Sequence, residues 1–190
     1  MNIQALLNQG FNLLKNSPSP TAMLDSEILL SKVLKKNREY LILNCKENLP
    51  KESIELFYNL LERRKQNEPI AYIVKKKEFW KQTFYIDQSV LIPRPDTEVL
   101  VQETLKLFGK NFNLRILDIG TGSGCILLSL LKERENFMGT GIDISKKAIN
   151  VARFNAKLHQ LSNRVKFFNS DVDKFLFGKY DLILSNPPYI

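Results

Sequence analysis

The residues best suited to chemistry follow the short apolar run Leu182–Ser185, where Asn186 precedes Pro187, Pro188 and Tyr189. A residue before proline is held in an extended conformation, and proline has no N–H to donate. The side-chain oxygen of Asn186 and the fixed carbonyl of Pro187 could therefore accept both N–H bonds of a planar NH2 group. Tyr189 could pack on the flat face of that group. This corner predicts recognition of a planar nitrogen.

A glycine-rich turn, "LDIGTGSGCILL", contains Gly120, Gly122 and Gly124. Glycine lets the backbone approach a ligand closely, and the start of the following helix offers free N–H groups to an anion. The turn therefore predicts a nucleotide-like ligand. A dinucleotide fingerprint would have its third glycine at position 125, which is Cys125, so the match to that motif is imperfect. Taken alone, the turn could also be a tight connection without a ligand.

Two further strand ends carry polar residues. Asp143 ends the next predicted strand, where a carboxylate can accept hydrogen bonds from both hydroxyls of a ribose. Ser170 and Asp171 end the strand after it, near the expected position of an adenine edge. Ligands of open α/β sheets bind outside the carboxyl ends of the strands. The coincidence therefore predicts one nucleotide site at this edge of a sheet.

The composition is that of an ordinary globular protein. The apolar fraction of 44% and the charged fraction of 25% exclude a disordered chain. No window approaches the roughly 18 apolar residues of a membrane span, and the first residues do not resemble a leader peptide. We therefore expect a cytoplasmic protein without a membrane partner. Cys45 and Cys125 lie far apart and His159 is the single histidine, so neither a disulfide nor a metal site is expected.

The net charge of +8 raises the question of a nucleic-acid partner. The charge is spread evenly, with +4 in residues 1–90 and +4 in residues 91–190. The densest basic cluster, Lys75–Lys77, is more typical of a solvated turn than of a binding surface. The charge is compatible with a polyanionic partner such as the ribosome but does not require one.

The first seventy residues predict a small helical bundle. In the first helix the apolar residues fall on one buried face at helical spacing. A second helix runs from about Met23 to Leu34. Asn37 can cap a short third helix over residues 38–43, and Pro50 suits the first turn of a fourth helix. The predicted buried face of the first helix consists of Ile3, Leu6, Leu7, Phe11 and Leu14.

From about residue 70 the pattern changes to alternation of apolar and polar residues. Residues 71–74 and 79–86 predict a hairpin with the lysines at its turn, and "LIPRPDTEVLVQETLKLF" predicts a loop followed by a helix capped by Asp96 or Thr97. Beyond it, strands alternate with helices, which predicts βαβ units around a parallel sheet. The predicted strands are 115–120, 138–144, 165–171 and 180–185, and the helices between them are 122–133 and 145–159.

Together these residues resemble a known family. "DIGTGSG", Asp143, "SD" and "NPPY" look like the class I S-adenosylmethionine-dependent methyltransferases that act on planar nitrogens. The N-terminal helices and "LIPRPDTEVLV" narrow the resemblance to the release-factor glutamine methyltransferases, which methylate the side-chain amide of the GGQ glutamine in peptide chain release factors. The resemblance implies S-adenosyl-L-methionine as cofactor and a release factor as protein substrate.

The resemblance also implies the fold class and the domains. We expect an α/β chain with a helical substrate-recognition domain over 1–70, a β-hairpin linker over 71–92, and part of a Rossmann-like methyltransferase domain over 93–190. The sheet of the family has seven strands in the order 3-2-1-4-5-7-6, of which four are recognised here. We therefore expect further strands beyond Ile190 and hypothesise that the chain is a truncated product, a gene fragment or one half of a split protein.

The roles of the site residues are carried over from the resemblance. The turn would contact the methionine part of the cofactor, Asp143 the ribose, and Asp171 with Val172 the adenine, while Asn186 would lie against both cofactor and substrate. The catalytic residues would be Asn186, Pro187 and Tyr189. The turn consists of Gly120, Thr121, Gly122, Ser123 and Gly124, and the glutamine would be held by Asn186, Pro187, Pro188 and Tyr189.

The sequence departs from the family at three positions, and two other functions stay open. Lys75 and Lys81 stand where the family usually has glycine, and Val172 stands where an aromatic residue often packs on the adenine. A nucleic-acid amino methyltransferase, acting on adenine or guanine, would share the glycine turn and "NPPY". An inactive remnant that only binds a release factor would keep the helical bundle.

Overall fold

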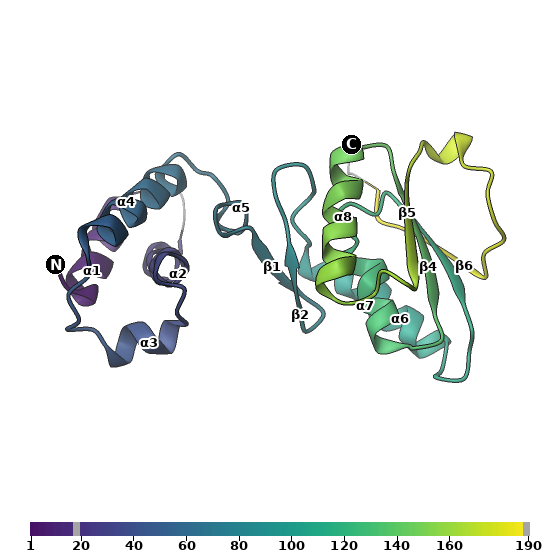
Figure 1. Cartoon of the computed structure of the whole chain (residues 1–190), viewed down its shortest axis with the longest axis horizontal. Helices are drawn as coiled ribbons and strands as arrows, with labels where there is room; N and C mark the ends of the chain where they lie inside the picture. Colours follow the sequence, from purple (N-terminus) through teal and green to yellow (C-terminus); the bar gives the residue numbers. More distant parts are fainter. Residues whose placement is uncertain (17–19, 188–190) are drawn as a thin grey trace. The chain divides into compact units, whose positions relative to one another are not determined.

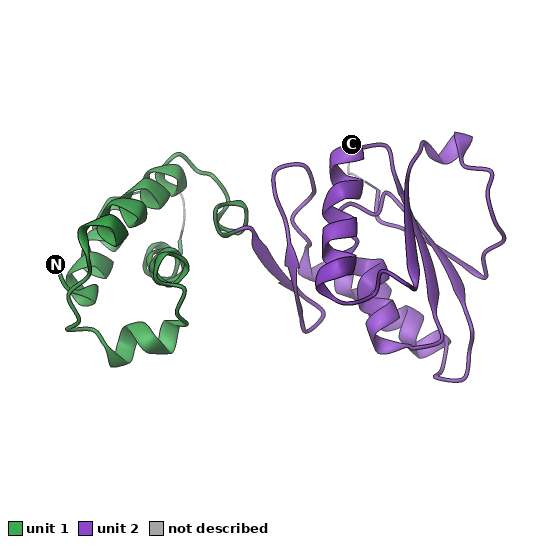
Figure 2. Cartoon of the chain, viewed as in Figure 1, with its two compact units in different colours: residues 1–74 green, residues 75–190 purple. Residues whose placement is uncertain are grey.

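The structure, a computed structural model, describes residues 1–16 and 20–187. The chain divides into two compact units, residues 1–74 and residues 75–190 (Figure 2). The first is helical, and the second contains a hairpin and a parallel sheet (Figure 1). In the part of the chain that the structure describes, no helix is both long and apolar enough to cross a membrane.

Unit 1 is the predicted helical bundle with one additional turn of helix. Its helices are α1 (Ile3–Leu14), α2 (Ala22–Leu34), α3 (Arg38–Leu43), α4 (Lys51–Lys65) and α5 (Ile70–Val74). The cap expected at Asn37 is confirmed, because its Oδ1 accepts a hydrogen bond from the backbone N–H of Tyr40 at 3.0 Å. Asn2 caps α1 in the same way through the N–H of Ala5 at 2.8 Å.

The buried face of α1 differs from the prediction at one residue. Phe11 is exposed, whereas Gly10 is buried. A Cβ at Gly10 would lie 2.8 Å from Ser26 Oγ and 3.0 Å from Phe57 Cζ, so α2 and α4 approach α1 closely at this glycine. Periodicity of apolar residues cannot identify a face that is centred on a glycine, and the prediction for Phe11 was wrong for that reason.

The prediction of a strand over residues 71–74 was also wrong. These residues form α5, in which the N–H groups of Tyr72 and Ile73 donate to the carbonyl of Pro69. Ile73 is fully buried in the core of unit 1. Burial of a side chain among helices outweighs the β-propensity of a short apolar run.

The hairpin forms from β1 (Lys76–Phe79) and β2 (Gln82–Tyr85), so its turn is at Trp80 and Lys81 and not at the lysine cluster. Both turn residues have positive φ, 46° and 61°, as a two-residue type I′ turn requires. Such turns are usually marked by Asn-Gly or Asp-Gly. Because neither pair is present, the sequence did not reveal the position of the turn.

Unit 2 contains a parallel sheet in the order β5-β4-β3-β6. Its strands are β3 (Arg115–Ile119), β4 (Met138–Asp143), β5 (Val165–Asn169) and β6 (Leu182–Ser185). The order confirms the expected 3-2-1-4 arrangement of the first four strands. The helical elements of this unit are η1 (Pro95–Thr97), α6 (Glu98–Leu107), α7 (Cys125–Glu133), α8 (Lys146–Leu158) and η2 (Val172–Lys174).

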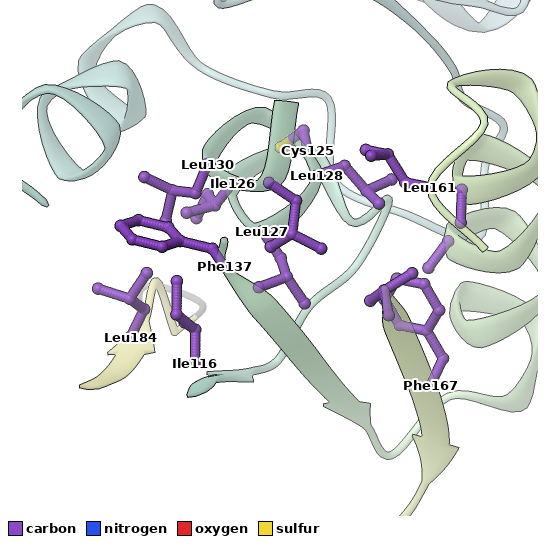
Figure 3. Close-up of a cluster of buried hydrophobic side chains, with 14 of the residues drawn as sticks. Ile116, Cys125, Ile126, Leu127, Leu128, Leu130, Phe137, Leu161, Phe167 and Leu184 are labelled. Atoms are coloured by element: carbon purple, nitrogen blue, oxygen red, sulfur yellow. The ribbon is translucent and has the colours of Figure 1, made fainter. Parts of the chain in front are cut away.

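The core of unit 2 is centred on α7, in which every residue from Cys125 to Leu131 is buried. Figure 3 shows part of this cluster, with Leu127, Leu128 and Leu130 among its labelled side chains. Two glycines of β4 make this packing possible. A Cβ at Gly139 would lie 2.9 Å from Leu127, and one at Gly141 would lie 2.6 Å from Phe167. Side chains of neighbouring elements occupy the space above these glycines, which fixes the position of β4 and of the residues that follow it.

Candidate active site

The glycine turn connects β3 to α7 and contains three residues with left-handed backbone. Gly120, Gly122 and Gly124 have φ angles of 70°, 54° and 79°. The N–H groups of Gly120 and Thr121 both donate to the carbonyl of Ile142 at 2.9 Å, which attaches the turn to β4. A Cβ at Gly120 would meet no atom within 4 Å, and one at Gly122 would meet only the Gly120 carbonyl at 3.9 Å. These two glycines therefore face open space.

That space is a cavity of about 400 Å³ at the carboxyl ends of all four strands. Its exposed apolar side chains Leu91, Ile144 and Val172 could cover a flat apolar group. Its polar groups come from the turn, the strand ends and the loop after the hairpin. The lining consists of Ser89, Val90, Leu91, Ile119, Gly120, Gly122, Ile142, Asp143, Ile144, Ser145, Ala148, Ser170, Asp171, Val172 and Asn186.

Asp143 holds two parts of this site together. One carboxylate oxygen accepts a hydrogen bond from the N–H of Gly122 at 3.0 Å, and the other accepts from the N–H of Ser145 at 2.8 Å. Each carboxylate oxygen can accept more than one hydrogen bond. Asp143 therefore fixes the turn and the start of α8, and it retains acceptor capacity toward the cavity that it lines.

The structure brings together six of the residues predicted from sequence. Gly120, Gly122, Asp143, Asp171, Val172 and Asn186 line the cavity. Thr121, Ser123 and Gly124 of the same turn are buried and are not part of the lining. Pro187 is exposed beside the end of β6. Pro188 and Tyr189 lie outside the described residues.

The sequence matches two domain families. Residues 5–74 match the PrmC N-terminal domain, and residues 95–190 match the Methyltransferase small domain. The release factor glutamine methyltransferase of Buchnera aphidicola subsp. Schizaphis graminum is 42% identical over 190 residues, which cover 100% of this chain and 68% of that protein. The chain belongs to the release factor glutamine methyltransferase family.

One further relative supports the same family assignment. The release factor glutamine methyltransferase of Buchnera aphidicola subsp. Baizongia pistaciae is 44% identical over 95% of this chain and 64% of its own length. The chain thus spans about two thirds of the length of these relatives. Among solved structures, a SAM-dependent methyltransferase from Geobacter sulfurreducens in complex with S-adenosyl-L-homocysteine is 26% identical with a TM-score of 0.41, over 48% of this chain and 36% of that one.

In this family member, Asn186 lies between two cavities. It lines the cavity at the strand ends and also a second one of about 630 Å³. Its Nδ2 donates to Thr97 Oγ1 at 3.2 Å. The residues that line the second cavity are Arg94, Asp96, Thr97, Val99, Leu100, Ser185 and Asn186. The motif "LIPRPDTEVLV" includes Thr97, but the sequence did not predict its hydrogen bond with Asn186.

A buried acid below the turn was missed by the sequence analysis. Asp118 is 1% exposed, and its Oδ2 accepts a hydrogen bond from Thr121 Oγ1 at 2.6 Å. Burial raises the pKa of Asp118 to about 7; the bond from Thr121 lowers this pKa and the nearby charge of Asp143 raises it. An acid inside an apolar strand, two residues before a glycine turn, is the signal that could have identified it.

A second missed residue, Asn155, connects the hairpin to the glycine turn. Its side chain is fully buried and donates from Nδ2 to the carbonyls of Tyr85 and Ser123, both at 2.9 Å. Its Oδ1 accepts from the N–H of Tyr85 at 2.8 Å. A single helix residue thus holds β2 next to the backbone of the turn. No local sequence pattern distinguishes this asparagine from others on α8.

Proposed function

We propose that this protein transfers the methyl group of S-adenosyl-L-methionine to the side-chain amide nitrogen of the GGQ glutamine in a peptide chain release factor. The observation that carries the proposal is the position of Asn186, at the end of β6 between two cavities. One cavity has the features of a donor site and the other is available to an acceptor. The proposal places the reaction in the cytoplasm, within reach of the ribosome.

The donor would occupy the cavity at the strand ends. Gly120 and Gly122 fit this assignment because both line the cavity and a Cβ at either would project into open space. Thr121, Ser123 and Gly124 are the buried residues of the same turn. Asp143 would accept hydrogen bonds from the ribose, and Asp171 with Val172 would hold the adenine. When bound, the donor supplies a methyl group on a positively charged sulfur.

The acceptor would be held by Asn186 and the residues that follow it. An amide nitrogen is a poor nucleophile because its lone pair is delocalised into the carbonyl. Oxygen atoms of Asn186 and Pro187 that accept both of its N–H bonds would orient the nitrogen and favour loss of planarity, with Pro188 and Tyr189 completing the contact. Catalysis would then depend on positioning and on preorganised dipoles, without a dedicated base.

Substitution of Asn186 tests this proposal. We expect Asn186→Ala to lower methyl transfer to a GGQ-containing release factor by more than about 100-fold, as loss of a preorganised polar group does in other enzymes. Binding of S-adenosyl-L-homocysteine, measured by calorimetry, should change only a few-fold. Asn163→Ala, at an exposed asparagine, is the matched control. Near-normal transfer by the Asn186 variant would refute the assigned role.

Assays of the unsubstituted protein with other acceptors separate the remaining alternatives. A nucleic-acid amino methyltransferase would transfer label to RNA or DNA, with binding that weakens steeply as salt increases. A protein that only binds a release factor would retain the factor in a pull-down and transfer no methyl group with any acceptor. Transfer to the GGQ glutamine alone supports the proposed function.

A further inference from the structure

The side chain of Asn186 has two different ends, and the structure gives a partner to one of them. Nδ2 donates to Thr97 Oγ1 at 3.2 Å. Among the described residues, no donor makes a hydrogen bond to Asn186 Oδ1. Because the carboxamide is planar, an Nδ2 group directed at Thr97 turns Oδ1 in a different, fixed direction. The pair therefore determines which atom of Asn186 is available to a ligand.

Thr97 is well placed to hold this orientation. It is the last residue of η1 and the N-cap residue of α6, where a threonine hydroxyl usually accepts a hydrogen bond from the helix backbone. Here the Thr97 side chain makes no capping bond. The sequence analysis expected a cap from Asp96 or Thr97, and the structure shows the Thr97 hydroxyl directed to Asn186 instead.

The helix start that carries Thr97 is anchored on both sides. The adjacent residue, Glu98, accepts a hydrogen bond from the N–H of Trp80 at 2.9 Å. Further along α6, Val101 is fully buried in the core of unit 2. Thr97 itself is half-buried. Its hydroxyl is therefore presented to Asn186 from a packed element.

We propose that Thr97 is a positioning residue that turns Asn186 Oδ1 toward the acceptor amide. This inference rests on the proposed function. The Thr97 hydroxyl oxygen accepts from Asn186 Nδ2, which leaves Oδ1 as the free acceptor of this carboxamide. An acceptor NH2 group can only donate. Once it is bound, the arrangement with Nδ2 on Thr97 and Oδ1 on the acceptor satisfies all three groups.

Two substitutions of Thr97 distinguish positioning from packing. Thr97→Val keeps the shape and removes the hydroxyl, whereas Thr97→Ser keeps the hydroxyl and removes a methyl group. With a glutamine-containing GGQ peptide, we expect kcat to fall about tenfold in the valine variant, the effect of about one hydrogen bond. The KM for the donor should stay within about twofold. The serine variant should recover most of the lost kcat.

A spectroscopic measurement on the purified protein tests the same pair without turnover. The side-chain 15N–1H signals of Asn186 are identified by their absence in Asn186→Ala. In the wild type and in Thr97→Ser, the two Nδ2 protons should have separate shifts and slow exchange with water. In Thr97→Val they should move toward the values of exposed asparagines.

The two measurements separate failure of this inference from failure of the proposed function. The inference holds if the Asn186 signals and kcat change in the valine variant and return in the serine variant. Unchanged Asn186 signals in Thr97→Val overturn it, and so does unchanged kcat. A wild-type protein that transfers no methyl group refutes the proposed function, and then the Asn186 signals alone decide whether Thr97 orients this side chain.

Discussion

Two regions of unit 2 use the same unusual backbone with opposite choices of residue. In the glycine turn, the left-handed positions at 120, 122 and 124 are all glycine. At the hairpin, Lys75, Trp80 and Lys81 have left-handed φ angles of 59°, 46° and 61° without a glycine among them. A left-handed residue other than glycine costs roughly 1 kcal/mol. The glycine turn avoids this strain, whereas the hairpin contains it.

The difference follows from what surrounds each region. Two glycines of the turn line a cavity, and a Cβ at either would project into open space. The hairpin has other stabilising contacts: the N–H of Trp80 donates to Glu98 and its indole N–H donates to Glu133, both at 2.9 Å. Glycine thus stands where the backbone lines a cavity, whereas at the hairpin hydrogen bonds from neighbouring helices can offset the strain of left-handed residues that are not glycine.

The largest effect is expected at the residue that joins these two regions. Asn155→Ala removes three hydrogen bonds, and it leaves without partners the buried carbonyl of Ser123 and the part-buried N–H and carbonyl of Tyr85. We expect a loss of about 2–4 kcal/mol in the free energy of unfolding. Urea denaturation followed by circular dichroism measures it.

Asn150→Ala is the matched control for this substitution, because Asn150 lies on the same helix and is exposed. Its effect should be within about 0.5 kcal/mol. If the two variants were equally stable, the bonds of Asn155 would not be what holds the hairpin to the turn, and the two regions would have to be treated as independent.

The second largest effect is expected at Asp118, the buried acid next to the glycine turn. The folded protein raises the pKa of this carboxyl from 3.8 to about 7. Between these values the folded state holds more protons than the unfolded state, so stability decreases as pH rises through this interval and levels off above pH 7. From pH 5 to pH 8 we expect this group to lower the free energy of unfolding by about 2–3 kcal/mol.

Asp118→Asn should flatten that part of the profile, because asparagine keeps an acceptor for Thr121 and does not ionise in this range. Urea unfolding at several pH values measures both slopes. Equal slopes for the wild type and the variant between pH 5 and pH 8 would assign the pH dependence to other groups.

The sheet and much of the site could be predicted because both depend on local signals. Apolar runs separated by helices determined the parallel strands, and ligands of such sheets bind at the strand ends, which directed attention to Asp143, Asp171 and Asn186. These three residues line one cavity in the structure. Their roles toward a ligand stay predictions.

What the sequence did not reveal depends on contacts between distant residues. Asn155 bonds to Tyr85, 70 positions earlier, and Asn186 bonds to Thr97, 89 positions earlier. The wall formed by residues 89–91 comes from the loop after the hairpin. Periodicity and turn preferences describe neighbours along the chain, so they carry no information about such pairs.

The smallest effect is expected when glycine replaces a left-handed lysine at the hairpin. Glycine at Lys75 or Lys81 removes the left-handed strain but increases the freedom of the unfolded chain, and the two contributions partly cancel. We expect each of Lys75→Gly and Lys81→Gly to stabilise unit 2 by about 0.5 kcal/mol. The ion pair of Lys81 with Glu133 is 3.8 Å long and its lysine is exposed, so its loss should have little effect.

Lys77→Gly is the control, at a strand residue with ordinary φ, and it should instead destabilise unit 2. If both lysine-to-glycine changes at the left-handed positions were destabilising, strain in the hairpin would be smaller than its φ angles indicate, and the contrast with the glycine turn would rest on the ligand cavity alone.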